Sequence, residues 1–417
     1  MNHMIRANVA PATSVRTTFY SPFKIKTVVE RLWSVAGHEG AAPAVPDLET
    51  FQKNVPCLSG QDYAALARRA YANRGGAPVY IGGSSGTTGP SKLVMSRILP
   101  PGIRHSDEDK LLIHRIRSAG LIRRSDVFLN LFMVGNFSIL HHGMNSILQA
   151  CQATILPNGA RAADMTGPAL DLIESCGVNG LTGTPATIAQ FAIALSEAGK
   201  TLPIRSILYT GEAFGGAKRK LVQEIFPHAR ITGFYGLSEA GFLGIETTSA
   251  GIYHVRSDAY FLELDPQDRL LVTCLDPHLP VPIVRYMTGD RVTVAKSGRD
   301  ILLSGIARTG RDFNFMGNII DTDDVRSAIG MASGMTDPDI EIRLTADSFG
   351  RDIMRVGVFG LSDDAGAIIA CHNALLALPA LSEAADKGQD IHVEPRGFET
   401  LATTDRHKQR LVIDDRA

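Results

Sequence analysis

The chain has 417 residues, 44% of them hydrophobic, and its 42 Lys and Arg residues nearly balance its 43 Asp and Glu residues. This length is too great for one hydrophobic core and predicts two or three domains. The small net charge argues against nucleic acid or an anionic membrane as a partner.

Five widely spaced cysteines without a Cys-x-x-Cys pair are typical of a reduced protein without structural zinc. The first residues lack the apolar core of a signal peptide, and no run of the sequence approaches the length of a membrane span. We therefore expect a soluble, cytoplasmic protein.

Residues 1–76 carry helical patterns at 25–36 and 59–72, joined by proline-rich loops. We expect them to form a helical cap that contributes no obvious chemistry. Further along the chain, Ser106 is suited to cap a helix whose first residues, 107–109, are acidic.

Residues 77–250 alternate between strand and helix patterns. Strands are expected at 127–132, 153–156, 180–182, 204–210 and 230–234, with helices between them at 137–151, 168–176, 186–198 and 215–226. Such alternation predicts right-handed crossovers onto a mostly parallel sheet, so the expected fold class is α/β.

The pattern changes twice after residue 250. Short strands are expected at 260–264, 270–273, 283–287, 292–295 and 301–304, and then helices and strands at 321–329, 340–346, 354–359, 363–377 and 391–395. The first group predicts a small β-rich subdomain, and the second predicts a small α+β domain.

The expected domain division follows from these changes. A large N-terminal domain, 1–308, combines the cap (1–76), the α/β part (77–250) and the β-rich part (251–308). A small, mobile C-terminal domain occupies 309–417, with Gly310 as the hinge.

The loop Gly82–Lys92, with the sequence Gly-Gly-Ser-Ser-Gly-Thr-Thr-Gly-Pro-Ser-Lys, offers backbone amides, hydroxyls and one cation to a polyphosphate. A Walker A motif is excluded because Pro90 follows Gly89 where that motif requires lysine. The loop also fits the nucleophile elbow of a hydrolase, with Ser84 as the nucleophile, and a flexible Gly/Ser turn. By itself it leaves the three interpretations open.

Polar motifs follow the later strands, where open α/β sheets bind their ligands. Thr-Gly-Glu-Ala stands at 210–213, Tyr-Gly-Leu-Ser-Glu at 235–239 and Tyr-Met-Thr-Gly-Asp at 286–290. Tyr235 is suited to stack on a purine, Ser238 to donate to a phosphate and Glu239 to hold Mg²⁺. Asp290 is suited to accept hydrogen bonds from a ribose diol. Taken singly, Glu239 is as readily a solvated acid at a helix start, and Thr-Gly-Asp an ordinary turn.

Taken in order, Ser-Ser-Gly-Thr-Thr-Gly, Thr-Gly-Glu-Ala, Tyr-Gly-Leu-Ser-Glu and Tyr-Met-Thr-Gly-Asp resemble the adenylate-forming superfamily of acyl-CoA synthetases, adenylation domains and luciferases. Within it, the short chain and the Tyr-Gly-Leu-Ser-Glu wording are most similar to the phenylacetate–CoA ligase family. The resemblance covers roughly residues 50–417, and the ordered set is far more specific than any single motif.

The resemblance implies a role for each matching residue. It places the ATP phosphates against Ser84, Ser85, Gly86, Thr87, Thr88, Gly89 and Lys92, adenine among Gly211, Glu212, Ala213, Phe234, Tyr235 and Gly236, phosphate and Mg²⁺ at Ser238 and Glu239, and the ribose at Asp290. Arg308 corresponds to the ribose or phosphate arginine at the hinge. Lys408, in the closing segment 408–414, is the candidate catalytic lysine of adenylation.

Three positions depart from the family pattern at the hinge. Ala307 replaces the glycine before Arg308, Gly310 stands where an acidic residue is usual, and Met316 replaces a basic residue. Adenylation is still expected, whereas domain rotation and the thioester-forming step remain open.

The acyl pocket is expected at Phe132, Asn136, Phe137, His141, Gly183, Thr184, Tyr209, Gly236 and Ala240. No Asp or Glu occurs from residue 127 to 163, so this wall lacks a carboxylate to pair with an ammonium, and an uncharged aryl or apolar acid is favoured. His141 and His142 lack a spaced acidic or cysteine partner and are expected to be packing or polar surface residues rather than metal ligands.

We therefore expect ATP- and Mg²⁺-dependent conversion of a carboxylic acid to an acyl-adenylate, with transfer to coenzyme A or another thiol. The alternative acceptors are an amine, a carrier protein or a hydroxyl that receives AMP. A serine hydrolase using Ser84 is the alternative from another class. A non-catalytic nucleotide-binding scaffold is disfavoured by the presence of Lys408 and Glu239. The sequence does not determine the oligomeric state, and a homodimer is one option.

Overall fold

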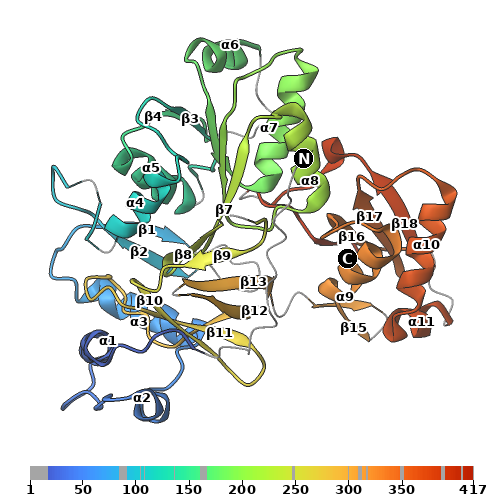
Figure 1. Ribbon diagram of the computed structural model, residues 1–417. Helices are drawn as coiled ribbons and strands as arrows, with labels where there is room; N and C mark the ends of the chain where they lie inside the picture. The colour runs from blue at the N-terminus through green and yellow to red at the C-terminus, as the bar shows by residue number, and fades with distance from the viewer. Residues whose placement is uncertain are drawn as a thin grey trace.

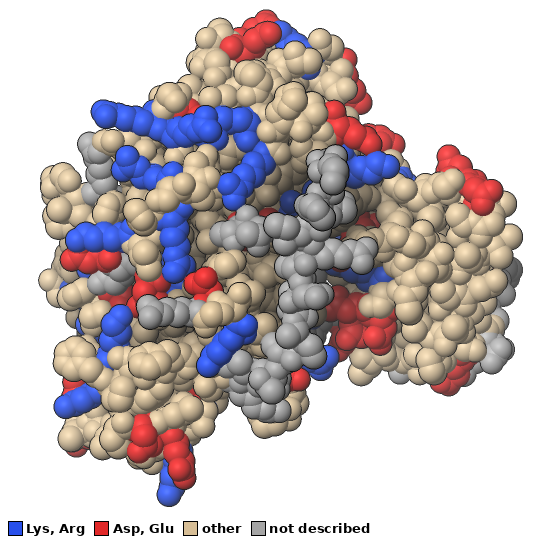
Figure 2. Space-filling view, in the orientation of Figure 1, with Lys and Arg blue, Asp and Glu red and all other residues tan. Residues whose placement is uncertain are grey.

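The computed structural model describes residues 17–83, 92–103, 105–107, 109–135, 137–159, 167–246, 249–298, 300–308, 312–315, 318–347, 352–386, 390–404 and 407–416. A large N-terminal part lies beside a smaller C-terminal part (Figure 1). Figure 2 shows basic and acidic side chains on the same face of the N-terminal part, in line with the balanced charge, and a largely uncharged surface on the C-terminal part.

The parallel half of the main sheet contains β3 (Val127–Asn130), β4 (Thr154–Pro157), β5 (Gly180–Gly183), β6 (Ser206–Tyr209) and β7 (Arg230–Leu237). These strands fall within two residues of most of the expected bounds, and every pairing among them is parallel. The predicted α/β class is confirmed.

Helices cover both faces of this half. Helices α4 (Lys110–Ser118) and α5 (Leu140–Ala150) share a buried apolar cluster with one face, and α6 (Gly167–Ser175), α7 (Pro185–Glu197) and α8 (Gly216–Ile225) share another with the opposite face. The start of α7 follows from its sequence, because the Thr184 hydroxyl accepts the amide of Thr187 and Pro185 is the first helical residue.

The expected start of α4 was wrong. The helix begins at Lys110, after Asp109, and not directly after Ser106. The Ser106 hydroxyl accepts the amide of Asp109 at 3.2 Å and donates to its carboxylate at 2.8 Å. These bonds close a turn that precedes the helix, since Ser and Asp side chains compete with helical backbone bonding.

The antiparallel half contains β8 (Gly241–Glu246), β9 (Tyr253–Val255), β10 (Tyr260–Leu264), β11 (Arg269–Cys274), β12 (Tyr286–Ser297) and β13 (Asp300–Arg308). Within the described residues, both halves form one sheet in the order β10-β11-β12-β13-β9-β8-β7-β6-β5-β3-β4. The β-rich part thus continues the parallel sheet through the antiparallel β7–β8 pair.

In place of the two strands expected at 283–287 and 292–295 there is one strand, β12, which begins at Tyr286, and Thr-Gly-Asp lies inside it instead of in a turn. Gly289 has a φ of 78°, and the register with β13 shifts between Arg291 and Thr293. Glycine takes this φ without strain, and a register shift of this kind bends a strand without ending it, so the ladder continues past the motif.

The described part of the expected cap, residues 17–76, contains α1 (Pro22–Ala36), α2 (Leu48–Asn54) and α3 (Gly60–Ala72), which pack on the antiparallel half. The hairpin of β1 (Val79–Gly83) and β2 (Leu93–Arg97) flanks the loop from residue 84 to 91, which lies outside the described residues. The cap helix α3, this hairpin and the main sheet all line one cavity.

The C-terminal part contains a four-stranded sheet in the order β18-β17-β16-β19, formed by β16 (Ile340–Ala346), β17 (Asp352–Phe359), β18 (Asp390–Arg396) and β19 (Val412–Asp414). Helices α9 (Thr322–Ser333), α10 (Ala365–Leu376) and α11 (Pro379–Asp386) accompany it, as does the hairpin of β14 (Asp312–Phe315) and β15 (Asn318–Asp321). The predicted α+β character is confirmed, whereas β14, β15, α11 and β19 had not been expected.

No single described helix has the length and apolar composition to span a membrane; only α10 and α11 taken together, across a bend of 101°, pass that test.

Candidate active site

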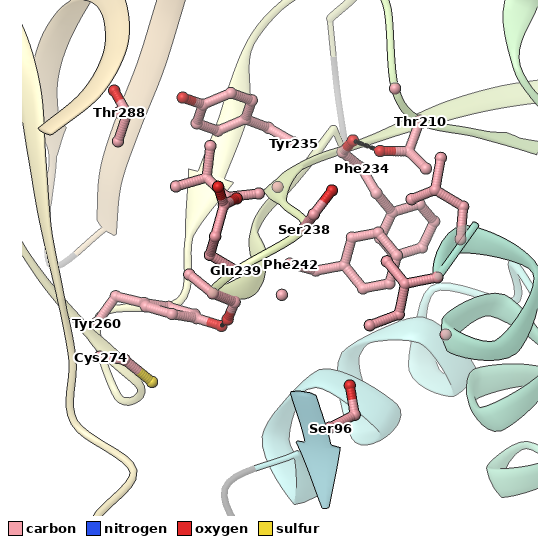
Figure 3. A pocket seen from close by; sticks show the side chains of 18 of the residues that line it. Ser96, Thr210, Phe234, Tyr235, Ser238, Glu239, Phe242, Tyr260, Cys274 and Thr288 are labelled. Carbon is pink, nitrogen blue, oxygen red and sulfur yellow. Dashed lines mark hydrogen bonds between the residues drawn. The ribbon is translucent and has the colours of Figure 1, made fainter. Parts of the chain in front are cut away.

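A cavity of ≈1220 Å³ lies where the carboxyl ends of β6 and β7 meet β12, β13 and the closing segment of the chain (Figure 3). Pockets for single small molecules span about 300–1,000 Å³, so this one has room for a nucleotide and a second molecule. All described residues of the predicted nucleotide and catalytic set line it: Lys92, Gly211, Glu212, Ala213, Phe234, Tyr235, Gly236, Ser238, Glu239, Asp290, Arg308 and Lys408.

Asp290 is held by three elements. Its carboxylate accepts the Tyr235 hydroxyl at 2.8 Å and the Arg308 guanidinium at 3.1 Å, and its amide donates to the Thr288 hydroxyl. Asp290 and Arg308 are direct cross-strand partners of β12 and β13. A carboxylate accepts about four hydrogen bonds, so Asp290 retains the capacity to accept two from a vicinal diol.

Burial and the neighbouring Asp290 charge raise the pKa of Tyr235 well above its ordinary value. The phenol therefore stays protonated across the physiological range and keeps donating to Asp290. This bond and the ion pair fix the carboxylate before any ligand arrives.

Glu239 forms a second polar group with Lys92 and Tyr286. Its carboxylate lies 3.1 Å from the Lys92 ammonium and accepts the Tyr286 hydroxyl at 3.0 Å, and Lys92 donates to that hydroxyl at 2.8 Å. Burial, then the Glu239 charge, raises the pKa of Tyr286. Figure 3 shows Glu239 and Ser238 projecting from the turn after β7.

The described residues offer no group of three or more His, Cys, Asp or Glu side chains that could hold a metal alone. Glu239 supplies one carboxylate, the ligand type that Mg²⁺ prefers, and Mg²⁺ commonly takes its other ligands from substrate phosphates and water. The residues present thus fit Mg²⁺ in company with a triphosphate.

Lys408 enters the cavity from the C-terminal part. A side-chain carbon on Gly211 would lie 3.2 Å from Lys408 Cε and 3.6 Å from Nζ, so the lysine stem runs along this glycine. Gly211 has a φ of 97°, which L side chains rarely adopt, so glycine serves both the turn after β6 and the approach of the lysine.

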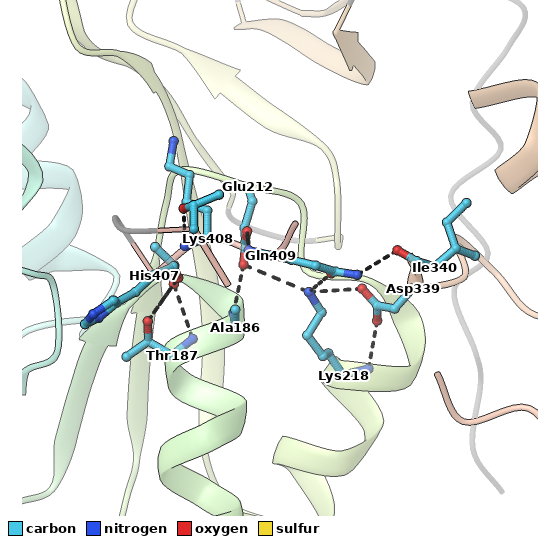
Figure 4. A network of polar contacts seen from close by, with 11 residues as sticks. Ala186, Thr187, Glu212, Lys218, Asp339, Ile340, His407, Lys408 and Gln409 are labelled. Carbon is cyan, nitrogen blue, oxygen red and sulfur yellow. Dashed lines mark hydrogen bonds and ion pairs between the residues drawn. The ribbon is translucent and has the colours of Figure 1, made fainter. Parts of the chain in front are cut away.

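Both neighbours of Lys408 in the chain are bonded to the N-terminal part (Figure 4). The carbonyl of His407 accepts the Thr184 hydroxyl at 2.6 Å, and the amide of Gln409 donates to Glu212 at 2.7 Å. Glu212 also accepts the amide of Ala186 at 2.8 Å. Although Glu212 lines the cavity, its carboxylate is thus engaged mainly in holding the segment that carries Lys408.

The residues expected in the acyl pocket lie in different surroundings. Gly236 and Ala240 line the cavity, but Phe132, Gly183, Thr184 and Tyr209 are buried elsewhere, Phe137 is exposed, and His141 lies outside the lining. Tyr209 lies beneath Gly233 and donates to Glu246, and Thr184 caps α7 while holding His407. Tyr209 and Thr184 therefore contact residues that neighbour the cavity and do not line it themselves.

The apolar wall comes instead from one face each of α4 and α5 together with β7 and β8: Leu112, Ile113, Leu140, Ile147, Ala150, Phe234 and Phe242. The spacing of Leu140, Gly143, Ile147 and Ala150 along α5 places them on one helix face. That helical period is the sequence signal for this wall; the expected pocket included only His141 from this helix.

His142 lines the cavity and stacks on Tyr80, with ring centroids 3.7 Å apart. Burial, and then His141, lowers its pKa. The neutral imidazole is therefore the form that this end of the cavity favours, and the prediction that it packs agrees with the stack.

The remaining predicted site residues, Ser84 to Gly89 and Asn136, lie outside the described residues, as do Gly310 and Met316. The phosphate-loop and serine-nucleophile interpretations of Gly82–Lys92 both stay predictions.

A scan against protein-family models found no match. An indoleacetate–lysine synthetase from Pseudomonas savastanoi is 29% identical over 371 residues, which cover 88% of this chain and 92% of that protein. A crystal structure of a 2-hydroxyisobutyryl-CoA ligase in the postadenylation state aligns with a TM-score of 0.67 and 18% identity, over 94% of this chain and 88% of that one. The same ligase in its thioesterification state aligns with a TM-score of 0.57 and 20% identity, over 96% and 91%.

Proposed function

We propose that this chain, which has the fold of the adenylate-forming acyl-CoA ligases, uses ATP to convert a carboxylic acid into an acyl-adenylate, releasing pyrophosphate. The observation that supports this proposal is that one cavity is lined by four residues from distant parts of the sequence, namely Lys408, Asp290, Arg308 and Glu239. The predicted particular closeness to phenylacetate–CoA ligases remains part of this proposal.

In the proposed reaction, a carboxylate oxygen of the acid forms a bond to the α-phosphorus, and the bond from that phosphorus to the β-phosphate oxygen breaks. Both reactants are anions, so catalysis depends on positioning and on cations placed where charge accumulates. Lys408 and Arg308 are assigned to the phosphates, and Asp290 to the ribose hydroxyls. Mg²⁺ bound at Glu239 would neutralise phosphate charge.

The acid is proposed to be an aryl or other apolar carboxylic acid. Leu112, Ile113, Ile147 and Phe242 favour an apolar group at the α4–α5 end of the cavity. The depressed pKa of His142 keeps a neutral ring there. An uncharged body attached to a reacting carboxylate matches this division of the cavity into apolar and polar ends.

The acceptor is proposed to be a thiol such as coenzyme A or, as the second candidate, an amine. The amine is supported by similarity along most of the chain to a protein named for joining indoleacetate and lysine. Charged residues of both signs also line the cavity beside the apolar wall, namely Arg97, Asp109, Arg256 and Asp276. Arg256 is already paired with Asp109 at 3.0 Å, so the support for an amine rests mainly on the similarity.

The test is ATP–pyrophosphate exchange with a panel that includes indoleacetate, phenylacetate, benzoate and aliphatic acids. Acid-dependent exchange is expected, strongest with an aryl acid. Mass spectrometry of products formed with coenzyme A, with L-lysine or with neither then identifies the acceptor class. If every acid fails to promote exchange while ATP still binds, acid adenylation is the wrong reaction.

A further inference from the structure

A second lysine, Lys218 in the first turn of α8, lies behind the cavity with a side chain only 1% exposed. Its sequence context, Gly-Gly-Ala-Lys at the start of a helix, did not single it out. Moving an ammonium group from water into a protein interior costs on the order of several kcal/mol of free energy unless charged or polar partners surround it. Its partners therefore indicate what the residue is for.

Two of those partners belong to the C-terminal part. The Lys218 ammonium lies 3.0 Å from an Asp339 carboxylate oxygen and donates to Oε1 of Gln409 at 2.7 Å (Figure 4). The third, Glu212, lies 4.0 Å away and comes from the turn after β6. One buried cation thus joins the N-terminal part to the residue that follows Lys408.

The backbone supports the same contact. Asp339 also accepts the amide of Lys218 at 3.2 Å, so this carboxylate from the C-terminal part caps α8, whose own N-cap residue is Gly215. A side-chain carbon at Gly215 would lie 2.4 Å from Asp339, and one at Gly216 would lie 2.5 Å from the carbonyl of Thr336. The paired glycines therefore permit the close approach of the two parts.

Gln409 is held from several directions at once. Its amide donates to Glu212, its side-chain carbonyl accepts from Lys218, and its side-chain NH₂ donates to the carbonyl of Ile340 at 2.8 Å. With His407 bonded to Thr184, the backbone on both sides of Lys408 is fixed. Apolar contacts around Phe359 and Phe398 add area to this interface but little directional restraint.

We propose that Lys218 is a positioning residue for Lys408. Through Gln409, Glu212 and Asp339, Lys218 holds the segment 407–409, which carries Lys408, against the N-terminal part. The cost of burying the ammonium is offset only when all three partners are in place. The pairing therefore favours one arrangement of the two parts over arrangements held together by apolar contacts alone. Lys218 touches no reacting atom; it acts through the placement of Lys408. This inference rests on the proposed adenylation.

The first test compares Lys218→Met with Lys220→Met, an exposed lysine on the same helix that pairs with Glu224. Lys218→Met should lower kcat of pyrophosphate exchange by about 10²-fold, the cost of misplacing a catalytic group by about 1 Å. Its dissociation constant for ATP should stay within about twofold, because the proposed ribose contact is made by Asp290, on strand β12. Lys220→Met should behave as the parent does.

The second test separates positioning from a general structural role. If Lys218 acts through Lys408, the double variant Lys218→Met/Lys408→Ala should be no slower than Lys408→Ala alone. Multiplying losses would overturn the inference. Asp339→Asn should reproduce the kcat loss from the opposite side of the pair, and it keeps the test valid should Lys218→Met not fold.

Hydrogen exchange gives a readout that does not need turnover. In Lys218→Met, the amide of Gln409 should exchange faster than in the parent, while amides of the β17 core keep their protection. Unchanged protection at Gln409 would overturn the proposed role even if activity falls. If the parent protein shows no ATP–pyrophosphate exchange with any acid, the proposed function fails. The hydrogen-exchange result still decides whether Lys218 holds the segment that carries Lys408.

Discussion

The two sides of the cavity are held in place by different means. Asp290 and Arg308 face each other across one antiparallel ladder and are joined to Tyr235 within the same sheet. Lys408 stands on a loop of the C-terminal part, and its neighbours His407 and Gln409 reach the site through bonds between two parts of the molecule. One side is built into a sheet, whereas the other is completed by docking.

This contrast separates binding from chemistry. A preformed carboxylate on a sheet can bind a ribose whatever the C-terminal part is doing, whereas a lysine on a docked loop acts only when that docking is correct. We therefore expect changes on the Asp290 side to affect nucleotide affinity, and changes on the Lys408 side to affect the rate of the chemical step. The predictions below test that division, from the largest expected effect to the smallest.

Lys408→Ala should lower kcat of pyrophosphate exchange by about 10²–10³-fold, because a cation is lost where negative charge builds up. Its affinity for ATP, measured by calorimetry, should change little. A large loss of ATP affinity with an unchanged kcat would place Lys408 on the binding side and reverse the comparison.

Asp290→Asn should weaken ATP binding by about 10- to 100-fold, since charge-assisted hydrogen bonds to the ribose become neutral ones. The effect on kcat at saturating ATP should be smaller. Asp300→Asn, at an exposed carboxylate on the neighbouring strand β13, is the matched control and should keep the parent's affinity. Equal losses in the two variants would remove the specific role of Asp290.

Thr184→Val should lower kcat by about 2- to 10-fold, the value of one hydrogen bond of about 0.5–1.5 kcal/mol, because the bond to the carbonyl of His407 is lost. ATP affinity should be kept. Thr184→Ser retains the hydroxyl and should retain the rate. Since the hydroxyl also caps α7, thermal unfolding of both variants should be measured alongside the kinetics.

His142 should give the smallest effect, on stability at acidic pH. Its pKa is lowered in the folded state, so the fold favours the neutral ring. Stability is therefore fully present above the unfolded-state pKa of about 6.5 and is lost as pH falls below it toward the folded-state pKa. Urea unfolding at pH 7.5 and 5.5 should show a smaller pH difference in His142→Asn than in the parent, and an equal difference would contradict the assignment.

The strand pattern predicted much of the fold because buried parallel strands are short apolar runs separated by helices, a strong local signal. The strand at 206–209 was found in this way, within the expected range 204–210. The division of β12 into two strands failed because Thr288-Gly289-Asp290 has the composition of a turn, while ladder bonds on both sides keep it in the sheet. Local composition could not register those distant partners.

The sequence motifs named polar residues that the structure brings to one cavity, because the motifs at 210–213 and 235–239 stand at strand ends, where side chains of neighbouring strands converge. The apolar wall of the cavity was not predicted residue by residue, since Phe137 and Tyr209 satisfy the same apolar pattern whether they face solvent, core or cavity. Only packing decides which side of a strand or helix meets the ligand space.

The sequence by itself determined the chemical groups and most of the order of the elements, because these depend on residue type and local periodicity, and the ordered motifs supplied the proposed nucleotide-binding residues by resemblance. Only the tertiary structure decided the partners of Glu212, the burial of Lys218 and the anchoring of Lys408, because these depend on contacts between residues as far apart as 218 and 409. The energy of a buried charge is set by its surroundings, and residues distant in the chain supply them.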